Sequence, residues 1–254
     1  MVLRWLPHLL VALLIAVTAA QHLPRVAAFQ AAALGNPFPT QGSESLIVHE
    51  AGRLARGQSI YVENGPDARG FVSGPYTPLY FVAVAATLKL TPTVYAGGRA
   101  ITLASWLVLL LAVGALAWGG VGRVRRAALP GVLGALAAVV SLAVFSPGVI
   151  WAVRVKPTVP GLALAAVGLL VVQRAVGAGR GSRGVVDRSV LWAVPFFVAA
   201  FFTKQTTFAA AVAATLFLLV HAGPRAAARL ALLGAAVGGV LFAGLIVLTD
   251  GWLF

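Results

Sequence analysis

Acidic, cationic and phenolic side chains that could do chemistry gather between residues 22 and 98 of the 254-residue chain and in two later polar interruptions. Glu44 and Glu50 lie in the first segment, and either carboxylate could act as a general base toward an acceptor hydroxyl or amine. The cationic groups suited to binding a phosphate are Arg53, Arg99, Arg154, Lys156 and Lys204. These residue types suit a reaction between a membrane-dissolved lipid phosphate and a water-exposed acceptor.

A purely structural role is the alternative for several of these charges. Charged residues on an exposed helix are usually solvated, which is the alternative for Glu50, Arg53 and Arg56. Lys89 and Arg99 are expected to snorkel, with the apolar stem in lipid and the charged head at the water interface. The residue types therefore define a set of candidates and leave the role of each one open.

The two later interruptions each place a cation beside aromatic or hydroxyl side chains. Residues 151–157 read WAVRVKP, and residues 203–206 read TKQT. Lys204 breaks an otherwise continuous apolar run from Val190 to Val220. Polar residues at that depth are costly, which favours a functional role for Lys204. A simple hairpin turn between two helices is the alternative.

The composition defines the class of protein. The chain is 60% hydrophobic and 10% charged, whereas soluble domains are about 45–50% apolar and about 25% charged. This excludes a soluble enzyme, a disordered tail and a secreted disulfide scaffold. The absence of cysteine excludes a thiol nucleophile, and the four histidines show no metal-ligand spacing. The net charge of +13 would suggest nucleic acid only in a soluble protein. We predict an integral membrane protein with no nucleic-acid partner, and a divalent metal is the one cofactor left open.

Seven apolar stretches approach the roughly 20 residues that a helix needs to cross a bilayer. They are Trp5–Gln21, Ile101–Trp118, Pro130–Ser146, Val159–Val172, Val190–Thr203, Thr207–Val220 and Leu230–Thr249. Within the first, Leu9–Ala20 could instead be the apolar part of a signal peptide, because Arg4 precedes it and small residues end it.

The stretch Pro78–Leu90 decides the topology. Its 13 residues are too few for a spanning helix and favour an interfacial one. Without that crossing, an N-terminus inside the cell leaves three basic loops inside, as the positive-inside rule requires; these loops carry Arg123, Arg125, Arg126, Arg174, Arg180, Arg183, Arg188, Arg225 and Arg229. We therefore predict seven spans in the cell membrane, with segment 22–98 as the first outer loop and the active face outside the cytoplasm. An N-outside chain with eight spans is the alternative.

A short amphipathic helix is predicted over Ser43–Arg56 in this outer loop. Ser43 is a suitable N-cap, and Glu44 lies in the first turn, where the helix dipole favours an anion. The apolar residues repeat on one face, as in a helix lying on a membrane surface, and Gly57 is positioned to end it.

Two further patterns carry no chemistry. Residues 179–184 fit the G-x-G-x-x-G spelling of a dinucleotide loop, but they follow a membrane helix and not a strand, so a basic linker is expected. Gly234 and Gly238 form a small-xxx-small pair that favours close helix packing.

Several motifs, in order along the chain, resemble one family. They are Gly42–Leu46, Ala51–Tyr61, Pro75–Phe81, Gly98–Ala100, Val153–Leu164 and Phe202–Thr206. The first two resemble the first outer loop of GT-C fold glycosyltransferases of the family-39-like type. Pro75–Phe81 resembles the Pro-x-Leu-Tyr-Tyr stretch that opens their juxtamembrane helix, and the likeness covers most of the chain from about Asn36.

The resemblance implies an all-α, multi-pass GT-C domain over 1–254 that forms an N-terminal part of a longer enzyme. Such enzymes transfer a sugar from a polyprenyl-phosphate donor to an extracytoplasmic acceptor. Glu44 matches the catalytic base by position, and the motifs place Tyr61, Tyr76 and Gln205 with the charged candidates at the substrate site. The implied partners are the lipid-linked sugar, membrane lipids, and the missing C-terminal part or a partner subunit.

A non-catalytic membrane protein is the alternative function. Many family members carry an Asp where this chain has Ser43, and another in the second outer loop where it has Lys156-Pro157-Thr158. A transferase remnant, a partner subunit or a lipid carrier would fit these departures.

Overall fold

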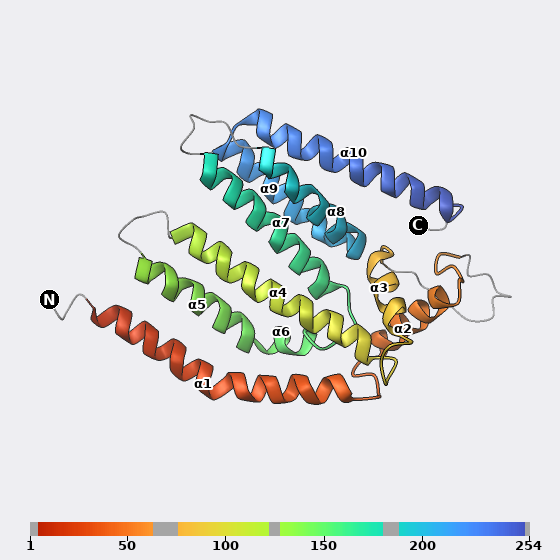
Figure 1. The fold of residues 1–254 in the computed structure, drawn as a ribbon, viewed down its shortest axis with the longest axis horizontal. Helices are drawn as coiled ribbons and strands as arrows, with labels where there is room; N and C mark the ends of the chain where they lie inside the picture. Colours follow the sequence, from red (N-terminus) through yellow and green to blue (C-terminus); the bar gives the residue numbers. More distant parts are fainter. Residues whose placement is uncertain (1–4, 63–75, 122–127, 180–187, 252–254) are drawn as a thin grey trace.

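The computed structural model describes residues 5–62, 76–121, 128–179 and 188–251, and within them the regular secondary structure is helical. Long helices run side by side, and short helices cluster at one end of the bundle (Figure 1). The elements are α1 (Leu6–Gly35), α2 (Gly42–Ala55), α3 (Leu79–Thr87), α4 (Ala96–Val121), α5 (Ala128–Val144), α6 (Ser146–Trp151), α7 (Thr158–Gly179), η2 (Arg188–Ala193), α8 (Val194–Thr203), η3 (Gln205–Thr207), α9 (Phe208–His221) and α10 (Pro224–Leu248).

Four of these helices, α1, α4, α7 and α10, are long and apolar enough to cross a membrane. They correspond to four of the seven predicted spans. The other three predicted spans form the shorter apolar helices 128–144, 189–203 and 205–221. At about 1.5 Å per residue, these three would cover about 22–26 Å, less than a bilayer core of about 30 Å. The four long helices indicate a membrane protein.

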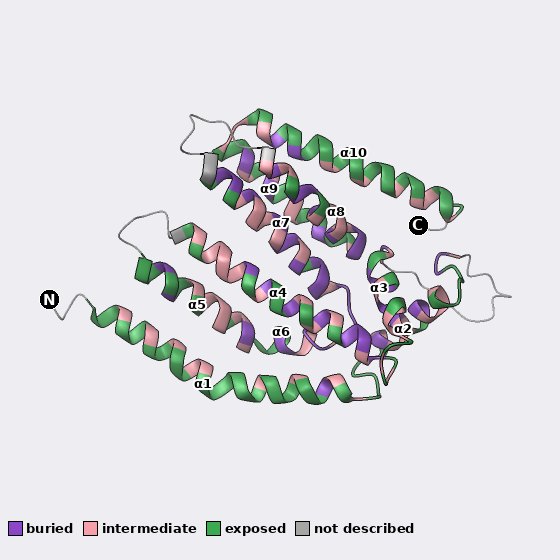
Figure 2. Cartoon of the chain, in the orientation of Figure 1, coloured by how far each residue is buried: buried purple, intermediate pink, exposed green. Residues whose placement is uncertain are grey.

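The pattern of burial is that of a bundle surrounded by lipid. Within the most apolar window of each helix, 56% of the residues are buried in α7, against 6% in α10 and none in α1. Figure 2 shows α7 as the most buried helix and α1 and α10 as largely exposed. Outward-facing leucines and valines on this scale would aggregate in water, but they match the apolar interior of a bilayer.

Helix α7 is central because α4 packs on one side of it and α8 and α9 on the other, and α10 packs on α8 and α9. Trp106 and Ala163 belong to the first core, and Val172, Phe197 and Leu218 to the second. Gly98 permits a further close approach, since an added Cβ would lie 2.6 Å from Val155 Cγ1. The start of α4 is thereby held against the segment between α6 and α7.

The predicted α2 is confirmed with one correction at its start. The N-cap is Gln41, which makes no side-chain capping bond. The prediction that Ser43 caps the helix is therefore wrong. Gly57 ends it as predicted, with a φ of 73°. The Gly57 and Gln58 amides donate to the Leu54 and Arg53 carbonyls, which is the Schellman arrangement.

Two boundaries in segment 22–98 bear on the topology. Helix α1 continues through Pro24 to Gly35. The prediction that the outer loop begins at residue 22 is therefore wrong, because residues 22–35 are helical. Helix α3 has nine residues, about 14 Å, which agrees with the prediction that Pro78–Leu90 does not cross the membrane as one helix. The rest of that apolar stretch forms turns.

The polar segments meet at one end of the bundle. Helices α2, α3 and α6, the start of α7 and the α8–α9 turn lie there, while the starts of α5 and α10 lie at the opposite end (Figure 1). Arg225 and Arg229 lie in the first two turns of α10 at that opposite end. Most of the other basic residues used for the topology lie outside the described residues.

Single-cysteine labelling tests this two-ended arrangement, because the chain has no cysteine of its own. Gln58, Gln205 and His221 are exposed. We expect Gln58→Cys and Gln205→Cys to react with a membrane-impermeant maleimide from one side of the membrane, and His221→Cys only from the other. Labelling of Gln58→Cys and Gln205→Cys from opposite sides would contradict the fold.

Candidate functional site at the polar end of the bundle

The site is built on a small core beneath α2 and α3. Ile47 and Ala51 of α2 pack with Tyr80, Phe81 and Val84 of α3, all nearly inaccessible to solvent. These contacts follow from the apolar spacing of the two helices, which places one face of each toward the other. The polar side chains of the site surround this core.

Glu44 and Arg99 form the best-connected pair at the site. Both side chains are fully buried, and Arg99 Nη2 lies 3.2 Å from Glu44 Oε2. Arg99 Nε donates to Oε1 at 3.4 Å, and the Val155 amide donates to the same oxygen at 2.8 Å. Thr40 adds bonds to Oε2 from its amide and its hydroxyl. Both carboxylate oxygens therefore have several donors.

The other donors of Arg99 bind the end of α1. Its Nη1 donates to the carbonyls of Ala33 and Asn36 at 2.9 and 2.6 Å, and its Nη2 to that of Phe38 at 2.7 Å. The guanidinium also lies 5.1 Å from the Tyr95 ring centroid. The expectation that Arg99 snorkels is therefore wrong, because buried acceptors satisfy it more completely than interfacial water could. Arg99 joins α1, α2 and α4.

These contacts decide the protonation of Glu44. Burial raises the pKa of a carboxyl group, but here hydrogen bonds from Arg99, Val155 and Thr40 together outweigh it, and the pKa of Glu44 is lowered. Glu44 is thus an ionised structural link. To accept a proton from a substrate it would first have to exchange one of these bonds.

Glu50 is buried as well, so the alternative that it is a solvated surface charge is wrong. The pKa of the nearby Tyr61 hydroxyl is raised by burial and by the negative charge of Glu50. Tyr61 therefore stays protonated, and it donates to the Tyr76 carbonyl at 2.6 Å. This bond ties the end of the loop after α2 to the start of α3.

The remaining charges of α2 face outward. Arg53 donates to the Ser59 carbonyl at 3.0 and 3.1 Å and so closes the turn after the helix. Arg56 is exposed, as solvation predicts. Neither residue is shown beside the buried acids.

Three cations, Arg154, Lys156 and Lys204, form a second cluster, which we call the cation group. Lys204 Nζ donates to Thr158 Oγ1 at 2.8 Å and lies 6.0 Å from the Tyr76 ring centroid. Lys156 Nζ lies 5.4 Å from the Trp151 ring centroid, and its residue is only 8% exposed. Arg154 Nη1 reaches Gln41 Oε1 at 3.5 Å.

The partners of the cation group are neutral. In the described part of the chain, none of its three members forms an ion pair, whereas Glu44 is paired with Arg99. Burial lowers the pKa of Lys156, and the charges of Arg154 and Lys204 lower it further, while Glu44 opposes the shift. Burial also lowers the pKa of Lys204. A bound anion would relieve both shifts, so the cation group is suited to hold one.

The structure thus brings Glu44, Arg99, Tyr76 and the cation group to one end. Gln205 is exposed in η3 and makes no bond described here to the other candidates. The partners Thr40, Gln41, Trp151 and Thr158 were not predicted as site residues. Thr40 had no clear signal in the sequence, because it stands four residues before Glu44, one more than the spacing of a capping box.

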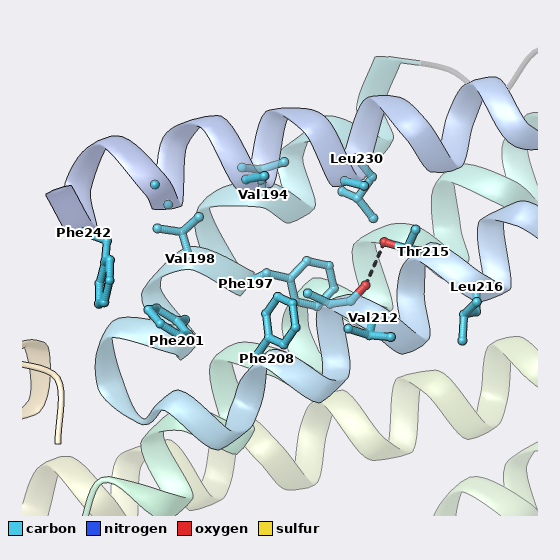
Figure 3. Close-up of a pocket in the computed structure, with 16 residues that line it drawn as sticks. Val194, Phe197, Val198, Phe201, Phe208, Val212, Thr215, Leu216, Leu230 and Phe242 are labelled. Carbon is cyan, nitrogen blue, oxygen red and sulfur yellow. Dashed lines mark hydrogen bonds between the residues drawn. The ribbon is translucent and has the colours of Figure 1, made fainter. Parts of the chain in front are cut away.

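An apolar cavity of about 520 Å³ lies between α8, α9 and α10. Phenylalanines line one end of the cavity (Figure 3). On the α10 side, Gly234, Gly238 and Gly239 form part of its wall. The hydroxyl of Thr215 donates to the Ala211 carbonyl of its own helix, so it offers little to a ligand. Phe201 and Phe208 flank the turn that carries Lys204. The cavity has the size and chemistry to accept a hydrocarbon chain.

The chain matches no protein-family description, no curated protein and no solved structure. The site must therefore be interpreted from its own chemistry. Among the described residues no three His, Asp or Glu side chains lie together as metal ligands, so no described residues are assigned to the divalent metal that the sequence left open.

Removing the guanidinium tests the structural role of the Glu44–Arg99 pair. We expect Arg99→Met to destabilise the protein by about 3–5 kcal/mol, because it leaves a buried carboxylate without its counter-charge. The measurement is the thermal unfolding midpoint of the detergent-solubilised protein. Arg56→Gln, at the exposed C-cap of α2, is the matched control and should unfold at the same temperature as the wild type. An unchanged midpoint for Arg99→Met would refute the role given to the pair.

Proposed function

We propose that this chain is a membrane glycosyltransferase that uses a polyprenyl-phosphate-linked sugar and an acceptor outside the cytoplasm. The observation that carries the proposal is the cation group, because three positive side chains with only neutral partners are arranged for an anion at one end of a membrane bundle. A lipid phosphate is an anion that reaches such a site through the bilayer. The motif resemblance supports sugar transfer as the reaction.

The proposed topology has seven spans with the polar end outside. Four long helices support a membrane protein, and three shorter apolar helices would complete the spans by tilting little or by locally thinning the bilayer. The basic residues at the opposite end support placing that end in the cytoplasm. The sugar acceptor would then meet the donor at the outer interface.

The cations would act on the leaving group. When the bond between the sugar and the phosphate oxygen breaks, negative charge develops on the phosphate, and fixed positive groups stabilise it. Lys156 and Lys204 are placed for this role, with Arg154 at the edge. The apolar cavity behind the Lys204 turn would hold part of the lipid chain.

The base is the second part of the mechanism. The resemblance assigns it to Glu44, whose low pKa makes it ionised but weakly basic. Glu50 is the other buried acid at this end. Under this proposal Glu44 acts as the base only if substrate displaces one of its donors; otherwise it positions Arg99 and the Val155 amide, next to Lys156.

A non-catalytic lipid-phosphate binder is the second candidate function. Both carboxylate oxygens of Glu44 already accept hydrogen bonds from the protein, which favours a binder without a catalytic base. Both candidates require the cation group, but only the transferase requires a carboxylate that can accept a proton.

Replacement of Glu44 separates these roles. Because Glu44→Gln removes the counter-charge of buried Arg99, its unfolding midpoint should fall under either role, and the comparison is made on folded variant. If Glu44 is the base, Glu44→Gln should lose transfer of radiolabelled sugar in membranes but still bind the lipid phosphate. If Glu44 only positions its neighbours, the same variant should lose binding and transfer together. Full transfer by Glu44→Gln would exclude Glu44 from the mechanism. Absence of transfer by the wild type with both polyprenyl-monophosphate and polyprenyl-diphosphate sugars would favour the binder.

The pH dependence of lipid-phosphate binding tests the lysines. An anion favours the ammonium form, so affinity should be full below the pKa values of free Lys156 and Lys204 and fall as pH rises through them. These pKa values lie below the usual lysine value of 10.5. The pKa of Lys156 also depends on the charges of Arg154, Lys204 and Glu44. Lys204 is faced by two neutral side chains, those of Thr158 and Tyr76.

We expect citronellyl phosphate to bind detergent-solubilised protein at least tenfold more weakly at pH 10 than at pH 7.5, a range in which the charge of the probe is constant. The double variant Lys156→Met/Lys204→Met should bind weakly at both values. A flat profile for the wild type would remove both lysines from the anion site.

A further inference from the structure

We propose that the lipid ligand of the cation group carries a diphosphate, so that the leaving group of the donor is a polyprenyl diphosphate and not a monophosphate. This inference rests on the proposed function and specifies the substrate class of the same site. The observation behind it is that the cation group has three positive charges and that the described contacts of its side chains are all with neutral groups.

The charges at the polar end can be counted pairwise. Glu44 lies within ion-pair distance of Arg99, so that pair is neutral. Arg154, Lys156 and Lys204 contribute three positive charges, and their contacts are the amide of Gln41, the ring of Trp151, and the hydroxyl of Thr158 with the ring of Tyr76. No described contact of these three side chains is with a carboxylate.

The two lysines of the cation group are held in place. Lys156 is more than nine-tenths buried beside Trp151. Lys204 ends α8 and is anchored by its bond to Thr158, the first residue of α7 and the second residue after Lys156. The Nε of Arg154 is buried without a hydrogen-bond partner in the described structure. The charges of Arg154 and Lys204 both act on Lys156, and such repulsion between like charges is relieved by a multiply charged anion.

The start of α7 adds to this field. Thr158 opens a helix of 22 residues, whose dipole places partial positive charge at its N-terminus. Lys204 bonds to the side chain of Thr158 at this N-terminus, so the helix dipole adds to the positive potential near Lys204.

A sugar-linked monophosphate carries one negative charge, which would leave about two positive charges uncompensated. A sugar-linked diphosphate carries two, and the diphosphate released on transfer carries up to three. In the reaction the bond between the anomeric carbon and the terminal phosphate oxygen breaks, and its electron pair stays on that oxygen. The acceptor oxygen forms the new bond to the anomeric carbon, and its proton goes to the base. The charge of the product thus matches the charge of the cation group.

The test compares three probes on the detergent-solubilised full chain. Citronellyl diphosphate, citronellyl monophosphate and uncharged citronellol share one short isoprenoid chain and differ only in the head group. We expect the diphosphate to bind at least tenfold more tightly than the monophosphate, which corresponds to about 1.4 kcal/mol, and citronellol to bind most weakly.

Variants assign any difference to the cation group. Lys204→Gln and Lys156→Met should each reduce the advantage of the diphosphate at least threefold, while Lys89→Gln, an exposed lysine after α3, should leave it unchanged. Unfolding midpoints show whether each variant is folded. If Lys156→Met does not fold, the test rests on Lys204→Gln, because Lys204 is partly exposed.

Each outcome has one meaning. Equal affinity for the two phosphates overturns the diphosphate inference and leaves the proposed lipid-phosphate site intact. Failure of both phosphates to bind more tightly than citronellol overturns the proposed function as well. A diphosphate advantage that both Lys204→Gln and Lys156→Met retain locates the site elsewhere and overturns the assignment to the cation group.

Discussion

The buried ion pair between Glu44 and Arg99 is the contact on which the polar end of this protein depends. Removing two charges from water is costly, and the cost is offset only because almost every donor and acceptor of the pair is used. Through these bonds Arg99 of α4 fixes the end of α1 and the start of α2, and Glu44 of α2 fixes the backbone at Val155. Without the pair, three segments distant in the sequence would have no common polar anchor.

The position of the cation group follows from this anchor. The Val155 amide bonds to Glu44, so the neighbouring residues Arg154 and Lys156 are held on either side of a fixed point. Gly98 allows α4 to approach that segment closely. Lys204 reaches it from the α8–α9 turn through Thr158. A neutral buried pair therefore supports an adjacent group of cations whose charges are left for a ligand.

Much of the helical order could be predicted from the sequence, because apolar run length and local end signals act within one segment. The apolar stretches, α2 and its Gly57 end were predicted in this way. The pairing of Glu44 with Arg99 was not, since the two residues are 55 positions apart and only tertiary packing brings them together. The same holds for the burial of Glu50. The continuation of α1 was missed because His22, Pro24 and Arg25 are typical of a loop, yet Pro24 is accommodated within the helix.

The central claim is that the polar end is organised to hold a lipid phosphate between Arg154, Lys156 and Lys204. The most direct measurement is a cryo-electron microscopy map of the protein in a lipid nanodisc with an added isoprenoid phosphate. The account predicts head-group density within hydrogen-bond distance of both lysine ammonium groups, with the Glu44–Arg99 pair intact beside it. Head-group density bound only at the opposite end of the bundle, or an Arg99 that leaves Glu44 to bind the phosphate itself, would contradict it.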